Sequence, residues 1–130
     1  MHIKTDVAQY LHDQGIGTLS STLFASFLPD DDQNFLIGVF DRTGLASDID
    51  IPTDKPRFQI IIRSVDYETG KAKLDAIFEA LHKPHLNSTL VSGGTYFYYI
   101  HADSSGGWIG RNDNDKDEFS INFTCYQRLS

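Results

Sequence analysis

Residues 113–117, Asp-Asn-Asp-Lys-Asp, alternate oxygen-bearing side chains at a spacing that could bind a cation. Alternating oxygen ligands of this kind open the calcium loops of EF-hand proteins. The rest of that motif is missing, because the sixth position is Glu118 instead of Gly and the twelfth is Thr124 instead of Glu. We therefore interpret residues 113–117 as a solvated hairpin turn and predict no metal site there.

Two histidines near the end of a predicted helix, His82 and His85, are the next candidates for shared metal binding. Pro84 breaks the helix between them, so the two imidazoles cannot share one helical face. A histidine at a helix C-terminus also has a structural explanation, since a cation there interacts favourably with the helix dipole. We interpret both histidines as structural.

Motifs for nucleotide binding and catalysis are incomplete in this chain. Gly15 and Gly17 follow a predicted helix, whereas glycines that hold a phosphate follow a strand and open a helix. Cys125 alternates with Phe123 on the apolar side of a predicted strand, where a thiol behaves as a small hydrophobic group. No G-x-S-x-G motif marks a nucleophilic serine. The sequence predicts no catalytic residue, no cofactor and no enzymatic activity.

The composition predicts a folded, acidic chain. With 130 residues we expect one domain over residues 1–130. The 11 basic residues are scattered among 18 acidic ones, for a net charge of -7, which argues against sequence-specific binding to nucleic acid. One cysteine allows no internal disulfide, and we find neither a signal peptide nor a long apolar run. We expect a soluble protein made in the cytosol.

Two amphipathic helices should position the remaining residues. Apolar residues recur every four positions over residues 3–14, and Gly15 follows where a left-handed helix cap is favoured. A second helix begins after Asp66 or Thr69, either of which can cap it, and ends before Pro84. Its predicted apolar face consists of Leu74, Ile77, Phe78 and Leu81. Its predicted outward side chains are Lys71, Lys73, Asp75 and Glu79.

Four strands are predicted at residues 35–40, 57–65, 95–103 and 118–129, from their period-two alternation and their β-branched and aromatic content. The Ser- and Gly-rich segment after the first helix should be irregular and should lay apolar side chains on the core, namely Leu23, Phe24, Phe27 and Leu28. Residues 42–56 are predicted to form a long connection. We infer an α+β fold: a mixed, mainly antiparallel sheet of about four to five strands with two main helices on one face.

The order of these elements resembles the small minor capsid proteins of long-tailed bacteriophages, the group that includes tail terminator proteins. Four segments carry the resemblance over nearly the whole chain: VAQYLHDQGIGTL, NFLIGVFDRTG, PRFQIIIRSVDYETGKAKLDAIFEALH and EFSINFTCYQRL. The third is the most specific, with a Pro, a strand of the form x-Gln-x-x-x-Arg, an Asp-Tyr pair and a helix ending in Leu-His. These are patterns of fold, so the resemblance carries over no catalytic residue.

The resemblance implies a structural virion protein of the tail or neck, assembled in the bacterial host cytoplasm. Members of the group form a hexameric ring at the head-proximal end of the tail tube, where they stop tube growth and offer a head-docking surface. The implied partners are further copies of the chain, the tail tube protein and a head-completion or neck protein. A closed ring uses head-to-tail contacts, so each subunit presents two different patches.

Four residues are the candidate contact residues. Arg42 and Arg57 lie at the ends of the predicted 42–56 connection. Trp108 and Arg111 lie in a Gly-rich turn predicted over residues 108–116, and both residue types are enriched in interface hot spots. Trp108 could equally fold back on the core.

Three other functions stay open on the sequence alone. The nearest is another head-completion or neck connector protein of the same assembly. A more distant one is a small metal-dependent enzyme or ligand-binding domain that uses Asp113, Asp115 and Asp117. The third is an acidic mimic of DNA, against which the mixed charges of the second helix argue.

Overall fold

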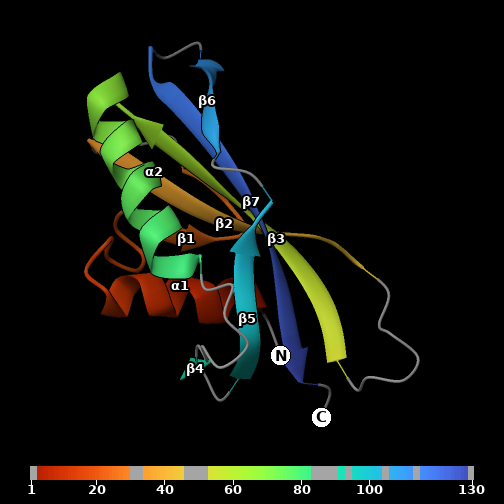
Figure 1. The fold of residues 1–130 in the computed structure, drawn as a ribbon. Helices are drawn as coiled ribbons and strands as arrows, with labels where there is room; N and C mark the ends of the chain where they lie inside the picture. Colours follow the sequence, from red (N-terminus) through yellow and green to blue (C-terminus); the bar gives the residue numbers. More distant parts are fainter. Residues whose placement is uncertain are drawn as a thin grey trace.

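The computed structural model describes residues 3–29, 34–45, 53–82, 91–92, 95–103, 106–112 and 115–128. This part of the chain contains two helices, α1 and α2, and seven strands, β1 to β7. Both helices lie on the same face of one twisted sheet (Figure 1). The predicted α+β fold is therefore confirmed, with a mixed, mainly antiparallel sheet. Within the described residues, no helix has the length and apolarity needed to cross a membrane.

Three long strands form the centre of the sheet. β2 (Phe35–Leu45), β3 (Thr53–Ser64) and β7 (Asp117–Arg128) pair antiparallel in that order. The short strand β1 (Leu23–Ala25) pairs parallel with β2, which makes the sheet mixed. β1 therefore forms one edge of the sheet.

Three further strands form the opposite side of the sheet. β5 (Thr95–Ala102) and β6 (Gly107–Arg111) both pair with the edge of β7 that faces away from β3. The two-residue strand β4 (Val91–Ser92) extends this side by pairing with β5. β1 and β6 consequently lie at opposite edges of one sheet.

Helix α1 (Ile3–Asp13) ends in the cap that the sequence predicts. Gly15 has a left-handed φ of 76°, and its N–H donates to the carbonyl of His12 at 3.0 Å. The next N–H, that of Ile16, donates to the carbonyl of Leu11 at 3.1 Å. This pair of hydrogen bonds is the Schellman motif, and the buried side chains of Leu11 and Ile16 provide its usual apolar contact.

Helix α2 (Tyr67–Leu81) begins at the predicted cap. The carboxylate of Asp66 accepts a hydrogen bond from the Thr69 N–H at 2.7 Å, which satisfies one of the free N–H groups of the first turn. Lys71 is exposed as predicted, but the prediction for Lys73 is wrong. Its ammonium donates to the Ile16 carbonyl at 2.9 Å and lies 4.2 Å from the ring centre of Phe35, so it bridges α2 to the end of α1 and to β2.

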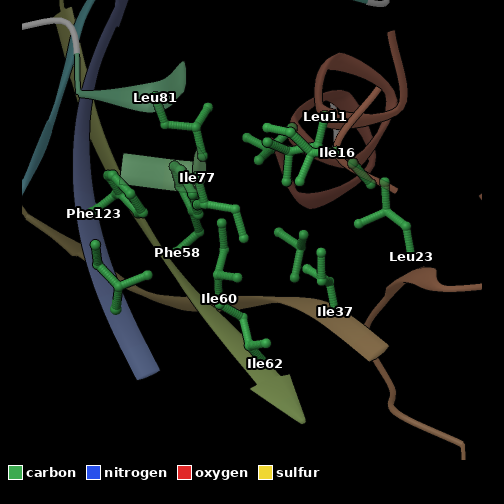
Figure 2. Close-up of a cluster of buried hydrophobic side chains, with 14 of the residues drawn as sticks. Leu11, Ile16, Leu23, Ile37, Phe58, Ile60, Ile62, Ile77, Leu81 and Phe123 are labelled. Atoms are coloured by element: carbon green, nitrogen blue, oxygen red, sulfur yellow. The ribbon is translucent and has the colours of Figure 1, made fainter. Parts of the chain in front are cut away.

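The core fills the space between the two helices and the sheet (Figure 2). Every second residue faces the helices from Phe58 to Ile62 of β3 and from Phe119 to Phe123 of β7, as the period-two pattern predicts. The rings of Phe58 and Phe123 stack with their centres 5.0 Å apart, directly under Ile77 and Leu81 of α2. The fully buried strand side chains of this face are Leu23, Ile37, Val39, Phe58, Ile60, Ile62, Ile100, Phe119, Ile121 and Phe123.

Two predictions about the connections are wrong. Residues 42–45 continue β2 and residues 53–56 already belong to β3, so the predicted 42–56 connection is mostly strand, and 46–52 lie outside the described residues. The two strands bond to each other well beyond the apolar stretch that a sequence pattern can detect. The segment predicted to be irregular contains β1, and only Leu23 of its four predicted core residues is fully buried. Phe27 is 54% exposed.

Candidate interaction surfaces

The β6–β7 hairpin places Trp108 beside a buried carboxylate. The Trp108 indole N–H donates to Oδ1 of Asp117 at 3.0 Å, and Nη1 of Arg111 lies 3.4 Å from Oδ2 of the same residue. The Asp117 side chain is 5% exposed, whereas that of Arg111 is 48% exposed. Because a buried carboxylate is costly unless it is paired and hydrogen-bonded, both contacts stabilise the hairpin. Asp117 thus brings together two of the four contact residues predicted from the sequence.

A bulge in β6 exposes two large apolar side chains in succession. Trp108 pairs with Phe119 and Gly110 pairs with Glu118, so Ile109 is an extra residue without a partner on β7. In a regular strand that covers a core, one of two consecutive side chains points inward. Here Trp108 is 51% exposed and Ile109 is 60% exposed. The bulge therefore turns both side chains toward solvent.

Tyr67, in the first turn of α2, extends this surface. Its ring centre lies 5.3 Å from that of Phe119, the residue that pairs with Trp108 across the hairpin, and Tyr67 remains 51% exposed. Tyr67 and Trp108 are therefore both neighbours of the fully buried Phe119, Tyr67 through a ring contact and Trp108 through strand pairing. We call the four residues Tyr67, Trp108, Ile109 and Arg111 the β6 patch.

The turn of the hairpin is shorter than the predicted 108–116 turn, because β6 occupies its first residues. The Asn112 N–H donates to the Lys116 carbonyl at 2.9 Å, and the Asn112 side chain accepts from the Lys116 N–H at 3.0 Å. Asp113 and Asn114 lie outside the described residues. The described part of the chain contains no group of three side chains arranged to hold a metal ion, and Asp117 is engaged by Trp108 and Arg111.

A second apolar surface lies at the β1 edge. The rings of Phe24 and Phe27 are tilted against each other with their centres 5.0 Å apart. Leu28 and Phe40 close over the backbone of Gly38, where an added Cβ would lie 2.9 Å from Leu28 Cγ and 2.7 Å from Phe40 Cε2. We call Phe24, Phe27, Leu28 and Phe40 the Phe27 patch. Sequence reasoning assigned Phe24, Phe27 and Leu28 to the core, because they are apolar residues in an aperiodic segment.

The Phe27 patch lies on the face of the sheet that the helices leave open. Gly38 sits between Ile37 and Val39, whose side chains point into the core, so the residues that cover Gly38 lie on the opposite face. The Ser26 N–H donates to the Val39 carbonyl at 2.8 Å and holds the chain against β2 just before Phe27. The β6 and Phe27 patches therefore occupy opposite edges of the sheet.

Arg57 is also placed differently from its prediction, because it lies within β3 and not at the end of a connection. Its Nη2 lies 3.2 Å from Oδ2 of Asp103, and the other oxygen of Asp103 accepts a hydrogen bond from the Thr124 hydroxyl at 2.7 Å. The Arg57 side chain is 26% exposed. Arg42 lies directly across from Arg57 on β2, but its side chain is outside the described part.

Polar pairs continue along the open face between β3 and β7. The Gln59 amide donates to the Ser120 hydroxyl at 2.8 Å, and Arg63 pairs with Glu118 at 3.1 Å. Among the described residues, the buried Oδ1 of Asn122 and Nε of Arg57 have no hydrogen-bond partner. This face is therefore polar in its centre and apolar at the β1 edge.

His82 has the structural role that the sequence suggests. As the C-terminal cap of α2, its N–H donates to the Phe78 carbonyl at 2.8 Å. Its imidazole stacks on the Phe78 ring with the centres 4.7 Å apart, and Nδ1 accepts a hydrogen bond from the Ala102 N–H at 3.1 Å. His82 thus ties the end of α2 to β5. His85 lies outside the described residues.

Two shifted pKa values have local causes within α2. The pKa of Asp66 is lowered because its carboxylate accepts the hydrogen bond from the Thr69 N–H. The pKa of Lys71 is raised because its ammonium donates to the Asp75 carboxylate four residues on, at 2.9 Å. Both shifts reflect contacts that stabilise the helix and neither marks a catalytic group.

A sequence profile of the family described as "Bacteriophage tail terminator protein" matches residues 10–127. The chain belongs to this family of phage tail terminator proteins. The matched range includes α2, β2, β3, all but the last residue of β7, and both patches, and the resemblance drawn from the four sequence segments is confirmed. The family consists of structural proteins of phage tails and virions.

One solved structure with the same fold is a chain of the "Virion of native gene transfer agent (GTA) particle". The similarity covers 97% of this chain and 94% of the other, with a TM-score of 0.72 and 14% sequence identity. At this identity the match speaks for the fold alone. No curated protein matches the chain.

Proposed function

We propose that this chain is the subunit of a homo-hexameric ring at the head-proximal end of a phage tail tube. The ring stops tube growth and offers the surface on which the head docks. Its partners are the tail tube protein below and a head-completion or neck protein above, and it assembles in the bacterial host cytoplasm. The chain acts by contact alone, without enzymatic chemistry or a cofactor.

The observation that carries this proposal is the pair of different apolar patches at opposite edges of one sheet, in a member of the terminator family. A closed ring uses heterologous contacts, in which one patch of each subunit meets a different patch of the next. The two patches satisfy that requirement. Arg42, Arg57, Trp108 and Arg111 remain the proposed contact residues. They form two groups along the sheet, since Arg57 pairs with Thr124 of β7 and Arg111 pairs with Asp117.

The acidic surface also suits a ring that encloses a DNA channel. With 18 acidic and 11 basic residues, the chain has a net charge of -7 and on average repels DNA. Repulsion lets DNA pass through the ring during packaging and ejection, whereas a basic lumen would hold it.

The proposal is tested by electron microscopy of particles from a phage or prophage that lacks this gene, with the gene supplied in trans as the control. We expect overlong or irregular tails detached from full heads, and normal virions after complementation. Heads without tails that leak DNA would instead support a head-completion role. Normal virions without the gene would refute any role in assembly.

The metal-dependent alternative has a separate test. Calcium and zinc are titrated against the purified chain while its melting temperature is followed. A site that binds only the native state raises the melting temperature as ligand accumulates. We expect no shift with either metal; a saturable increase would favour a metal site that includes Asp113 or Asp115.

A further inference from the structure

We propose that the β6 patch of one copy docks on the Phe27 patch of the neighbouring copy, an inference that rests on the proposed ring. Tyr, Trp and Arg are the residue types most enriched in interface hot spots, and the β6 patch contains one of each. The occupant of this patch is a second copy of the chain. The contact is heterologous, so it leaves a free β6 patch at one end of a dimer and a free Phe27 patch at the other.

The distribution of exposed apolar side chains supports this pairing. The large hydrophobic side chains that are more than half exposed, among the described residues, are Phe27, Tyr67, Trp108 and Ile109. All four belong to the two patches, and none lies elsewhere on the described surface. Because the patches occupy opposite edges of the sheet, copies that meet through them extend in one direction, as a ring requires.

The charge distribution points to the same contact. The chain has a net charge of -7, so two copies repel each other over most of their surface. Residues 14–29, which include most of the Phe27 patch, contain no charged side chain, and neither do residues 106–110 of the β6 edge. At both places two acidic copies can approach without bringing like charges together. Arg111 adds a single cation to the β6 patch.

Both patches are held in place before any partner binds. Trp108 is fixed by its hydrogen bond to Asp117, and Tyr67 rests on Phe119. On the other patch, Arg63 donates to the Pro29 carbonyl at 3.3 Å and anchors the chain just after Phe27 and Leu28. Side chains that are already ordered lose less entropy on binding, so little of the contact energy is lost to ordering.

The size of the patches explains why the contact needs the tube. A buried aromatic side chain covers about 150–250 Å², so the half-exposed residues of the β6 patch offer on the order of 300 Å². A stable interface buries about 800 Å² on each partner. The contact is therefore weak between free copies and becomes effective when a tube end holds the copies side by side.

Disulfide trapping between two single variants tests the contact without any tail. A Phe27→Cys chain is mixed with an Ile109→Cys chain under mild oxidation, and linked peptides are identified by mass spectrometry. Because the disulfide is covalent, linked chains accumulate even when the contact itself is weak. We expect the 27–109 link to form severalfold faster than the 27–27 and 109–109 links. A mixture of Ala72→Cys with Ile109→Cys is the matched control, since Ala72 is exposed on α2 outside both patches.

Each other outcome overturns the inference. A 109–109 link as the main product means that the β6 patch binds itself, and a 27–109 rate equal to the control means that the two patches do not meet. Native Cys125 is present in every mixture and is monitored by the same peptide analysis. Because tail morphology is scored separately, failure of this contact is distinguishable from failure of the terminator role.

Discussion

The indole N–H of Trp108 and the buried carboxylate of Asp117 are joined by a hydrogen bond of 3.0 Å. This contact fixes the one tryptophan of the chain at the surface, half exposed, on the helix side of the hairpin. Its cost is a buried negative charge, which Arg111 offsets from the exposed side. The hairpin thus holds the large apolar side chain of Trp108 in a solvent-exposed position.

Replacing Asp117 should therefore disturb both the hairpin and the patch. Asp117→Ala leaves the Trp108 N–H and the Arg111 guanidinium without their shared carboxylate, at an expected cost of about 1.5–3 kcal/mol for hydrogen bonds to a charged group. Urea denaturation measures the free energy of unfolding. Since the chain has a single tryptophan, its emission reports directly on Trp108. Asp115→Asn is the control, and an equal loss there would show that the effect is not specific to Asp117.

Gly70 allows α2 to lie close to the sheet, and a methyl group there should destabilise the fold. A Cβ at Gly70 would lie 2.2 Å from Cε1 of Phe119 and 2.5 Å from Oγ of Ser64. Gly70→Ala gains helix propensity, yet overpacking should outweigh the gain and cost about 1–3 kcal/mol. Thermal or urea denaturation measures the change. A stabilised Gly70→Ala variant would mean that α2 lies farther from β7 than in the structure.

The matched control uses the exposed side of the same helix. Ala72→Gly removes a methyl group that faces solvent, so only the propensity difference of about 0.5–1 kcal/mol should be lost. Gly70→Ala adds a methyl group and Ala72→Gly removes one, yet both should lower the free energy of unfolding. A loss of stability in both variants would separate packing at Gly70 from the intrinsic preference of the helix.

The fold was predictable where one physical signal dominates. Alternating residues such as Phe58 and Ile60 reveal a strand that covers a core, and Asp66 and Gly15 mark helix ends through their caps. Lys73 was predicted to face solvent because a charge usually does. Its contacts with a carbonyl and a ring come from the distant α1 turn and β2, which no local pattern records.

The patches were predictable only in part, for a similar reason. Trp108 and Arg111 were chosen as contact residues by type, but their common partner Asp117 and the bulge at Ile109 depend on the register between β6 and β7. Phe27 was assigned to the core, because an aperiodic segment does not reveal which of its aromatic residues lies beyond the last strand residue. The exposure of Trp108 depends on the register between β6 and β7, and that of Phe27 depends on the path of the chain after β1.

The cap of α2 should make stability depend on pH in a defined direction. The pKa of Asp66 is lower in the folded chain than in the unfolded chain, because the carboxylate accepts the Thr69 N–H. Its contribution is therefore fully present above the unfolded pKa of about 3.9 and is lost as pH falls through the folded value. Asp66→Asn keeps the cap but cannot titrate, since Asn caps about as well as Asp.

Measuring unfolding of wild type and Asp66→Asn from neutral to acidic pH checks this effect. We expect any advantage of the wild type to be greatest at neutral pH and to shrink as pH falls below about 4. Glu79→Gln is the control, because it removes a carboxylate from the exposed side of the same helix and leaves the Asp66 cap in place. Its free energy of unfolding should depend on pH through the cap as in the wild type. Parallel curves for wild type and Asp66→Asn down to low pH would show that the cap does not titrate.

The two patches should matter for tails more than for folding. Ile109→Glu and Phe27→Glu each place a charge on a side chain that is more than half exposed, so the purified variants should retain the wild-type melting temperature and Trp108 emission. In the complementation assay both variants should nevertheless yield overlong or detached tails, because a desolvated carboxylate in the contact between copies is costly.

Ala72→Glu is the control, because it adds the same charge to the exposed side of α2 and should restore normal virions. Normal tails with both patch variants would show that neither patch is needed for the ring, even if the gene itself proves essential for tail termination.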